Sequence, residues 1–278
     1  MRLQHIAEVP IFQGTTKEIC LWWLGQAGFA IAGAGKRLLI DAYLSDSLAR
    51  KYHGRQFTYT RMTPSPIDPQ TLTDIDIVLC SHAHTDHMDP DTLGPLAANN
   101  SQMRVVVPRA AKNEAAARGV PPEQIVSIDA GESAKIGDVI IEATASAHEE
   151  LEQNEKGQHH FLGFVVTLSG ACIYHSGDCA PFPGLAEGIQ NLRPDLALLP
   201  VNGRDAFRHE HGVPGNFTAD EALELCVAAE IPIMIAHHWG MFDFNTVAAE
   251  DVQAAAGRFA DRVRCLVPVV GECLAVDI

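Results

Sequence analysis

The chain has 278 residues, of which 47% are hydrophobic, so it is long enough to bury a substantial core. Its formal net charge is −15, and a field of that sign repels nucleic-acid backbones, so we expect no nucleic-acid partner. No apolar run approaches the roughly 18 residues that cross a bilayer, so we expect no membrane insertion.

Two further features predict a cytoplasmic protein. Residues 1–10 carry Arg2, His5 and Glu8 and lack the apolar core of a secretory signal. The seven cysteines are an odd number, and most lie inside apolar runs rather than in closely spaced pairs. We therefore expect free and mostly buried thiols.

The first half of the chain predicts strands followed by alternating strands and helices. Short apolar runs at 19–24, 29–32 and 37–40, separated by glycines, indicate an N-terminal β-meander. Residues 42–74 are richer in polar groups and proline and show no clean period, which predicts a long surface excursion of the kind that borders active sites. A strand, a helix, a strand and a helix then follow at 75–80, 90–99, 104–107 and 110–118.

The second half repeats this order of elements. Strands are predicted at 139–144, 161–168, 171–175, 196–201, 232–236, 263–267 and 273–277, and helices at 183–191, 218–230 and 246–259. Thr218 as N-cap and Glu221 three residues later form a capping-box pattern. Since no linker divides the halves, the sequence predicts one domain over 1–278, an α/β fold in which two sheets pack face to face with helices outside.

A dense group of polar residues follows the predicted strand 75–80, namely Ser81, His82, His84, Asp86, His87 and Asp89. In a loop leaving a strand, His82 and His84 can converge on one ion while Asp86 and His87 turn toward a second. Three imidazoles and a carboxylate are costly to bury without a cation. The pattern therefore favours a divalent metal site over a polar surface loop.

The chemistry-bearing residues also occur in a recognisable order. This order resembles the five signature motifs of the metallo-β-lactamase superfamily over nearly the whole chain: Asp41, then His82, His84, Asp86 and His87, then His148, Asp178 and His238. The resemblance implies a four-layer αββα sandwich with metals at the sheet edges. The segments 21–29 (LWWLGQAGF), 174–178 (YHSGD), 199–205 (LPVNGRD) and 237–244 (HHWGMFDF) look most like the L-ascorbate-6-phosphate lactonase-like branch.

The resemblance also implies a ligand set for two divalent ions, which could be zinc, manganese or iron. One ion would be held by His82, His84 and His148, the second by Asp86, His87 and His238, with Asp178 bridging the two. His237 is the alternative to His238, but the family pattern of a histidine directly before an aromatic residue and glycine favours His238. His237 would then be a neighbouring pocket group.

Several other residues are candidates for support or substrate contact. Asp41 could accept the free N–H of a ligand histidine or be a turn residue, and His175 could support the site or be a hydrogen-bonded core histidine. Asn202 and Arg204 follow the strand 196–201, where Arg204 could hold an anionic substrate or only pair with Asp205. Four further histidines are expected to be exposed, with His211 the best of them for substrate contact: His159, His160, His209 and His211.

The expected chemistry is hydrolysis, because divalent ions lower the pKa of bound water and supply a hydroxide nucleophile. Asp86 and Asp178 are the carboxylates best placed to orient that water. We expect a small anionic substrate, such as an L-ascorbate-6-phosphate-like sugar lactone. A phosphodiesterase or phospholipase-D-like hydrolase is one alternative, and a non-enzymatic metal-binding or sensing module is another. A homo-oligomer is compatible with the resemblance.

Overall fold

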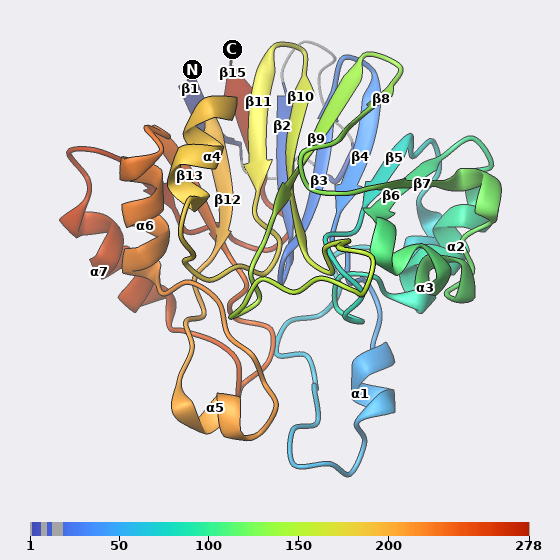
Figure 1. Cartoon of the computed structure of the whole chain (residues 1–278), viewed down its shortest axis with the longest axis horizontal. Coiled ribbons are helices and arrows are strands. Elements are labelled where there is room, and N and C mark those ends of the chain that lie inside the picture. The colour runs from blue at the N-terminus through green and yellow to red at the C-terminus, as the bar shows by residue number, and fades with distance from the viewer. Residues whose placement is uncertain (1, 7–9, 13–18, 278) are drawn as a thin grey trace.

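The computed structural model describes residues 2–6, 10–12 and 19–277. Two β-sheets pack face to face in the middle of the molecule, and helices cover the outer face of each sheet (Figure 1). This is the predicted four-layer αββα sandwich. Among the described residues, no helix is both long and apolar enough to cross a membrane.

The first sheet has eight strands in the order β1-β15-β2-β3-β4-β5-β6-β7. Strands β2, β3 and β4 pair antiparallel and form the predicted meander, whereas β4 to β7 pair parallel. The bounds of these strands are Arg2–Ile6 (β1), Ile19–Gly25 (β2), Gly28–Gly33 (β3), Lys36–Ile40 (β4), Ile77–Leu79 (β5), Arg104–Pro108 (β6), Ile125–Ile128 (β7) and Cys273–Asp277 (β15).

The second sheet has seven strands in the order β14-β13-β12-β11-β10-β9-β8. Strands β11 to β14 pair parallel and β8 to β11 pair antiparallel. The bounds are Ser133–Ile136 (β8), Val139–Ala145 (β9), Leu162–Leu168 (β10), Ala171–His175 (β11), Leu196–Pro200 (β12), Ile233–His237 (β13) and Arg264–Leu266 (β14).

Most of the helices cover one of the two sheets. Helices α2 and α3 cover the first sheet, and α4, α6 and α7 cover the second (Figure 1). Helices α1 and α5 cover neither sheet and project from one end of the sandwich, opposite to the ends of the chain (Figure 1). The bounds are Ser47–Lys51 (α1), Pro90–Asn99 (α2), Lys112–Ala117 (α3), Leu185–Leu192 (α4), Ala206–Glu210 (α5), Ala219–Ala228 (α6) and Ala249–Arg258 (α7).

Three apolar layers hold this arrangement together. The layer between the sheets contains fully buried side chains such as Phe29 and Phe164. Two outer layers join each sheet to its helices, through residues such as Leu93 on α2 and Leu223 on α6. Burial of such apolar surface stabilises the fold by about 25 cal/mol per Å².

The predicted elements agree with the structure in most of the chain. Helix 90–99 and strands 171–175 and 273–277 have the predicted bounds, and the Thr218 capping box is formed on α6. The sequence did not predict β1, β7, β8, α1 or α5. The polar excursion 42–74 contains α1, and part of it reaches the cavity described below.

Candidate metal centre

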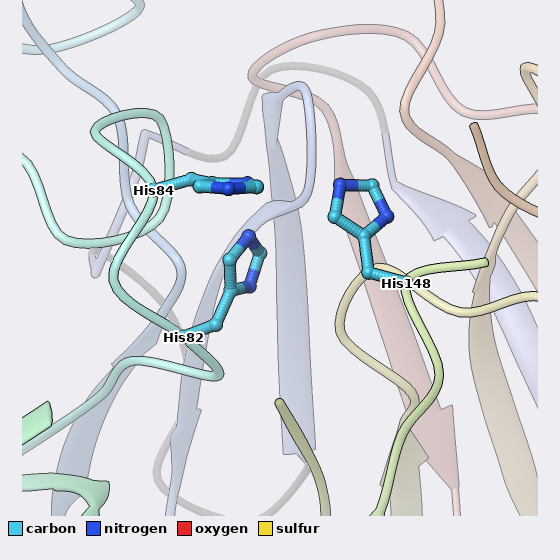
Figure 2. Close-up of side chains that lie close together, drawn as sticks. All are labelled: His82, His84 and His148. Atoms are coloured by element: carbon cyan, nitrogen blue, oxygen red, sulfur yellow. The ribbon is translucent and has the colours of Figure 1, made fainter. Parts of the chain in front are cut away.

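Every predicted metal ligand lies just beyond the end of a strand. The loop after β5 carries His82, His84, Asp86 and His87, while His148 follows β9, Asp178 follows β11 and His238 directly follows β13. His82 and His84 approach from one loop and His148 from another, with their rings gathered around a common space (Figure 2). Strand ends hold such side chains rigidly and close together.

The structure brings the predicted ligands into overlapping groups whose donor atoms lie within 4.8 Å of one another. These groups are His82 with His84 and His148, Asp86 with His87 and His238, and His82 with His87 and Asp178. The first two groups are the two predicted ligand triplets.

Asp178 lies between the two triplets. Its Oδ2 atom is 3.7 Å from Nε2 of His148 and 3.3 Å from Nε2 of His87. Its Oδ1 atom is 3.2 Å from Nε2 of His238. One carboxylate thus reaches ligands of both triplets, as a residue that bridges two ions would.

The donor set fits divalent metal ions. Nε2 of His82, Nε2 of His87 and Oδ1 of Asp178 are buried and make no hydrogen bond with any described residue. Leaving such atoms unsatisfied costs free energy, and imidazole nitrogens with carboxylates are the ligands that zinc, manganese and iron accept. Ions coordinated by these atoms would remove the cost.

Asp41 contacts His87, one of the predicted ligand histidines. It is fully buried at the end of β4, and its Oδ2 lies 2.8 Å from Nδ1 of His87. The backbone N–H and hydroxyl of Ser81 also donate to this carboxylate, at 2.7 and 2.5 Å. The contact places the Nδ1 proton of His87 on the Asp41 side and leaves Nε2 for the centre.

The adjacent histidines His237 and His238 have different places. His237 is the last residue of β13; its ring stacks on His175 at 4.9 Å and packs edge-on against Phe29 between the sheets. His238 has a left-handed backbone with φ of 61°, which turns its ring toward Asp178. The geometry therefore favours His238 over His237 as the proposed ligand, because His237 belongs to none of the groups of donor atoms.

His175 is a hydrogen-bonded core histidine that shapes the loop of Asp178. Its Nε2 donates to the carbonyl of Ala27 at 2.8 Å, and its Nδ1 accepts from the N–H of Gly177 at 3.0 Å. Gly177 has φ of 62°, and a Cβ there would lie 2.7 Å from the Cβ of Ser81. Only glycine fits this turn, which brings the Asp178 loop against the histidine loop.

Burial and neighbouring charges shift the pKa values of these histidines in opposite directions. Burial lowers the pKa of His82 and His84, and lowers that of His148 to about 4. For His87, burial also lowers the pKa, but the carboxylates of Asp178, Asp41 and Asp86 outweigh it and raise the pKa well above its ordinary value. These carboxylates therefore favour the protonated form of His87.

The centre opens into a cavity of about 200 Å³. Five of the predicted ligands line it: His84, Asp86, His148, Asp178 and His238. The walls include Lys51 and Tyr52 of the α1 region, Tyr59, Arg118 and Asn245. Sequence reasoning singled out none of these wall residues, since only the polar character of 42–74 indicated that the segment could border a site.

Tyr59 is held firmly in this wall. Its backbone has φ of 51°, which is unfavourable for an aromatic residue, and its ring packs against Tyr52, Phe242 and Phe244. Burial, and then the charge of Asp86, raise the pKa of its hydroxyl. The side chain is therefore a neutral phenol fixed beside the ligands.

Gln26 is another residue of the site that the sequence did not single out, although it lies in the segment 21–29. Its Nε2 donates to Oδ2 of Asp86 at 3.0 Å and lies 3.1 Å from Nε2 of His238. Its backbone carbonyl accepts from the N–H of His238 at 2.8 Å. This turn between β2 and β3 thus contacts two predicted ligands of the same triplet, Asp86 and His238.

The substrate role predicted for Arg204 disagrees with the structure. Its guanidinium binds both carboxylate oxygens of Glu221 at 2.6 and 2.7 Å, and it lines a separate depression with Glu149 and His209. Asp205, the partner considered as an alternative, pairs with Arg208 instead. Arg204 was mispredicted because Glu221, at the start of α6, satisfies it through a tertiary contact.

Asn202 lies behind the cavity rather than in its lining. It is buried, and its side chain donates to Asn245 at 2.7 Å and accepts from Asn216 at 3.0 Å. His211 is exposed and packs against Phe207, while the residues that follow it, Gly212 to Pro214, reach the cavity.

The remaining histidine predictions have mixed outcomes. His160 and His209 are exposed as predicted. His159 is half-buried, which corrects its prediction as a solvent-exposed residue, because its Nδ1 lies 2.8 Å from the Asp129 carboxylate. Five of the seven cysteines are buried, and Cys172 and Cys265 are half-buried.

Comparison with known proteins identifies relatives of this chain. A family model described as a beta-lactamase superfamily domain matches residues 36–239. A "UPF0173 metal-dependent hydrolase" of Methanoculleus marisnigri is 31% identical over 186 residues, covering 66% of this chain and 68% of the relative. A protein of the same description from Thermoplasma acidophilum is 27% identical over 236 residues, covering 84% of this chain and 89% of the relative.

Solved structures share the fold. An isothiocyanate hydrolase from Delia radicum gut bacteria superposes with a TM-score of 0.74, covering 93% of this chain and 99% of its own, at 19% identity. At that identity the likeness shows the architecture and leaves the substrate open.

Proposed function

The chain belongs to the metallo-β-lactamase superfamily, and we propose that it is a hydrolase that acts on small anionic molecules at a centre for two divalent ions. Its relatives are named metal-dependent hydrolases, which supports both the metal requirement and the reaction class. The proposed ions are zinc, manganese or iron, each compatible with a set of imidazoles and carboxylates.

The observation that carries this proposal is the position of Asp178 between two ligand triplets. Its two carboxylate oxygens lie 3.2 to 3.7 Å from His87, His148 and His238. Such an arrangement suits two ions held close together, which is the geometry of many hydrolytic metal sites. A lone structural ion would need only one closed set of four ligands.

The residues present can perform the hydrolytic steps. When bound, divalent ions would polarise water and lower its pKa to near neutrality. Asp86 and Asp178 can accept a hydrogen bond from the attacking water and orient it toward the substrate. Gln26 keeps Asp86 in place through its 3.0 Å hydrogen bond, and Asp41 keeps His87 in one tautomer.

The positive side chains in the cavity wall are evidence for a small anionic substrate. Lys51 and Arg118 line it, although the chain as a whole carries a net charge of −15. Arg118 is already bonded to Glu114 and to the carbonyl of Met88, whereas Lys51 makes no ion pair with any described residue. The cavity volume of about 200 Å³ lies below the usual range for drug-sized ligands, roughly 300–1,000 Å³.

A phosphorylated sugar lactone, as in the L-ascorbate-6-phosphate lactonase-like branch, is the specific substrate that we propose. The quoted segments 21–29 and 237–244 support it, because both contribute residues to the centre: Gln26 and His238. Arg204 gives it no support, since Glu221 occupies its guanidinium.

A panel of substrates tests the proposal with the metal-reconstituted protein. Neutral and phosphorylated lactones are compared with bis(p-nitrophenyl) phosphate, and turnover of lactones alone supports the lactonase. Turnover of the diester alone would instead favour the phosphodiesterase or phospholipase-D-like alternative. Metal uptake without turnover of any probe would favour the sensing module. We also propose a cytoplasmic location, which the odd number of cysteines, most of them buried, supports.

A further inference from the structure

Asn245 is a cavity residue that the steps above do not use. It lies in the loop after β13, is 8% exposed, and lines the same cavity as Asp86, Asp178 and His238. A buried amide beside a metal centre needs hydrogen-bond partners for both ends, its oxygen and its nitrogen.

The carbonyl end of Asn245 is occupied. Oδ1 accepts a hydrogen bond from Nδ2 of Asn202 at 2.7 Å and another from Nη1 of Arg208 at 2.8 Å. Since a guanidinium can only donate, the atom facing Arg208 has to be the oxygen, which settles the orientation of the amide. The Nδ2 group makes no hydrogen bond with any described residue, and is the end that the side chain can offer to the cavity.

A buried network fixes this orientation. Nδ2 of Asn216 donates to Oδ1 of Asn202 at 3.0 Å, and Nδ2 of Asn202 donates to Oδ1 of Asn245 at 2.7 Å. Each of the first two amides thus donates to the next one. Arg208 is 8% exposed, donates to the carbonyl of Asn202 at 3.1 Å, and is paired with Asp205. The chain of donors therefore ends at the Nδ2 group of Asn245.

We propose that Nδ2 of Asn245 donates a hydrogen bond to the substrate oxygen on which negative charge develops during hydrolysis. This role rests on the proposed function, since it requires a carbonyl or phosphoryl group bound at the centre. A donor held in place before reaction stabilises developing charge without reorganising, and one such donor contributes about 10² to 10³ in kcat. Asn245 is then a catalytic residue, and Asn202 and Arg208 are positioning residues.

Two substitutions at this position separate donation from support. Asn245→Asp keeps an acceptor for Arg208 and Asn202 but loses the donor, whereas Asn245→Ala loses both. With an uncharged lactone, we expect both variants to lose about a hundredfold in kcat with KM changed far less. Asn99→Ala, which removes an exposed amide bonded to the carbonyl of Gln70, serves as the control with unchanged kcat. Wild-type kcat in Asn245→Asp would overturn the proposal.

A binding measurement tests the same role without turnover. Inorganic phosphate is titrated into the zinc-loaded wild-type protein while the side-chain amide signals are followed by ¹H–¹⁵N NMR, with the Asn245→Asp variant assigning the resonance. We expect the Asn245 signal to shift strongly and the signal of Asn216, deeper in the network, to shift little. An unmoved Asn245 signal would overturn the proposal, whereas absent turnover alongside a shifted signal would count only against the hydrolase.

Discussion

The Oδ2 atom of Asp41 lies 2.8 Å from Nδ1 of His87, although 46 residues separate the two in the sequence. The contact joins the end of β4 to the loop after β5, two strands that pair parallel and side by side. It directs Nε2 of His87 to within 3.3 Å of Asp178. The bridge between the two triplets thus depends on a residue that touches neither proposed ion.

Replacing this support should weaken metal binding without unfolding the chain. Asp41→Asn keeps the shape of the side chain but presents a poorer acceptor to His87, so we expect the affinity for zinc to fall about 10- to 100-fold. Competition with a chromophoric chelator measures it. Asp76→Asn removes a carboxylate that pairs with Lys36 instead, and should leave zinc affinity unchanged. Equal affinities in the two variants would refute the role of Asp41.

Zinc binding should release the His87 proton. The pKa of His87 is raised above its ordinary value, so at pH 7 the metal-free protein carries a proton that the ion must displace. Affinity should therefore rise with pH until the pH passes the raised pKa. Calorimetry at pH 7 in two buffers of different ionisation enthalpy should give different heats, corresponding to about one proton from this group. Identical heats would contradict the prediction.

The metal-free protein should lose stability in mild acid. Burial lowers the pKa of His148 from 6.5 to about 4, so below pH 6.5 the unfolded chain binds a proton that the folded chain refuses. Neutral His148 therefore contributes to the free energy of unfolding by about 1.4 kcal/mol per unit of pKa shift. This contribution is complete above pH 6.5 and is lost as the pH falls toward 4. Urea unfolding at pH 7 and pH 5 measures it. The decrease in unfolding free energy between pH 7 and pH 5 should be smaller in His148→Gln than in wild type. An equal decrease in the two proteins would contradict the role of His148.

Removing the positive charge of Lys51 should affect anionic substrates selectively. Lys51→Ala should raise KM for a phosphorylated lactone by up to roughly fivefold, because a partly solvated charge contributes about 1 kcal/mol or less. KM for an uncharged lactone should stay the same, and salt should diminish the difference. Lys135→Ala on β8, away from the cavity lining, provides a matched control. An effect of equal size on both lactones would exclude charge recognition.

The sequence could predict that the proposed ligands gather at one place, because each of them lies in a loop that follows an apolar run. Such runs form strands, and the loops that follow β5, β9, β11 and β13 bring the proposed ligands together at one edge of the sandwich. Spacing alone could not separate His237 from His238. The left-handed backbone at His238, whose Nε2 lies 3.2 Å from Asp178, agrees with the family pattern that favours His238.

The walls of the cavity could not be predicted, because they depend on contacts between distant segments. Lys51 and Tyr59 come from a stretch with no regular period. Asn245 is held by Asn202, which follows β12, and by Arg208 on α5. The same physical reason explains the error at Arg204, whose partner Glu221 lies on α6. Strand β8 escaped prediction because it is only four residues long, Ser133–Ile136, too short for its polar–apolar alternation to stand out.

The most direct test of the central claim is the metal content of the reconstituted protein, measured by elemental mass spectrometry on wild type, His84→Ala and His160→Ala. His84 belongs to one ligand triplet, whereas His160 is exposed and outside all of the ligand groups. The two-ion centre predicts about two equivalents of zinc, manganese or iron in wild type and in His160→Ala, and a clear reduction in His84→Ala. Wild-type protein that takes up no metal, or a His84→Ala variant with undiminished content, would contradict it.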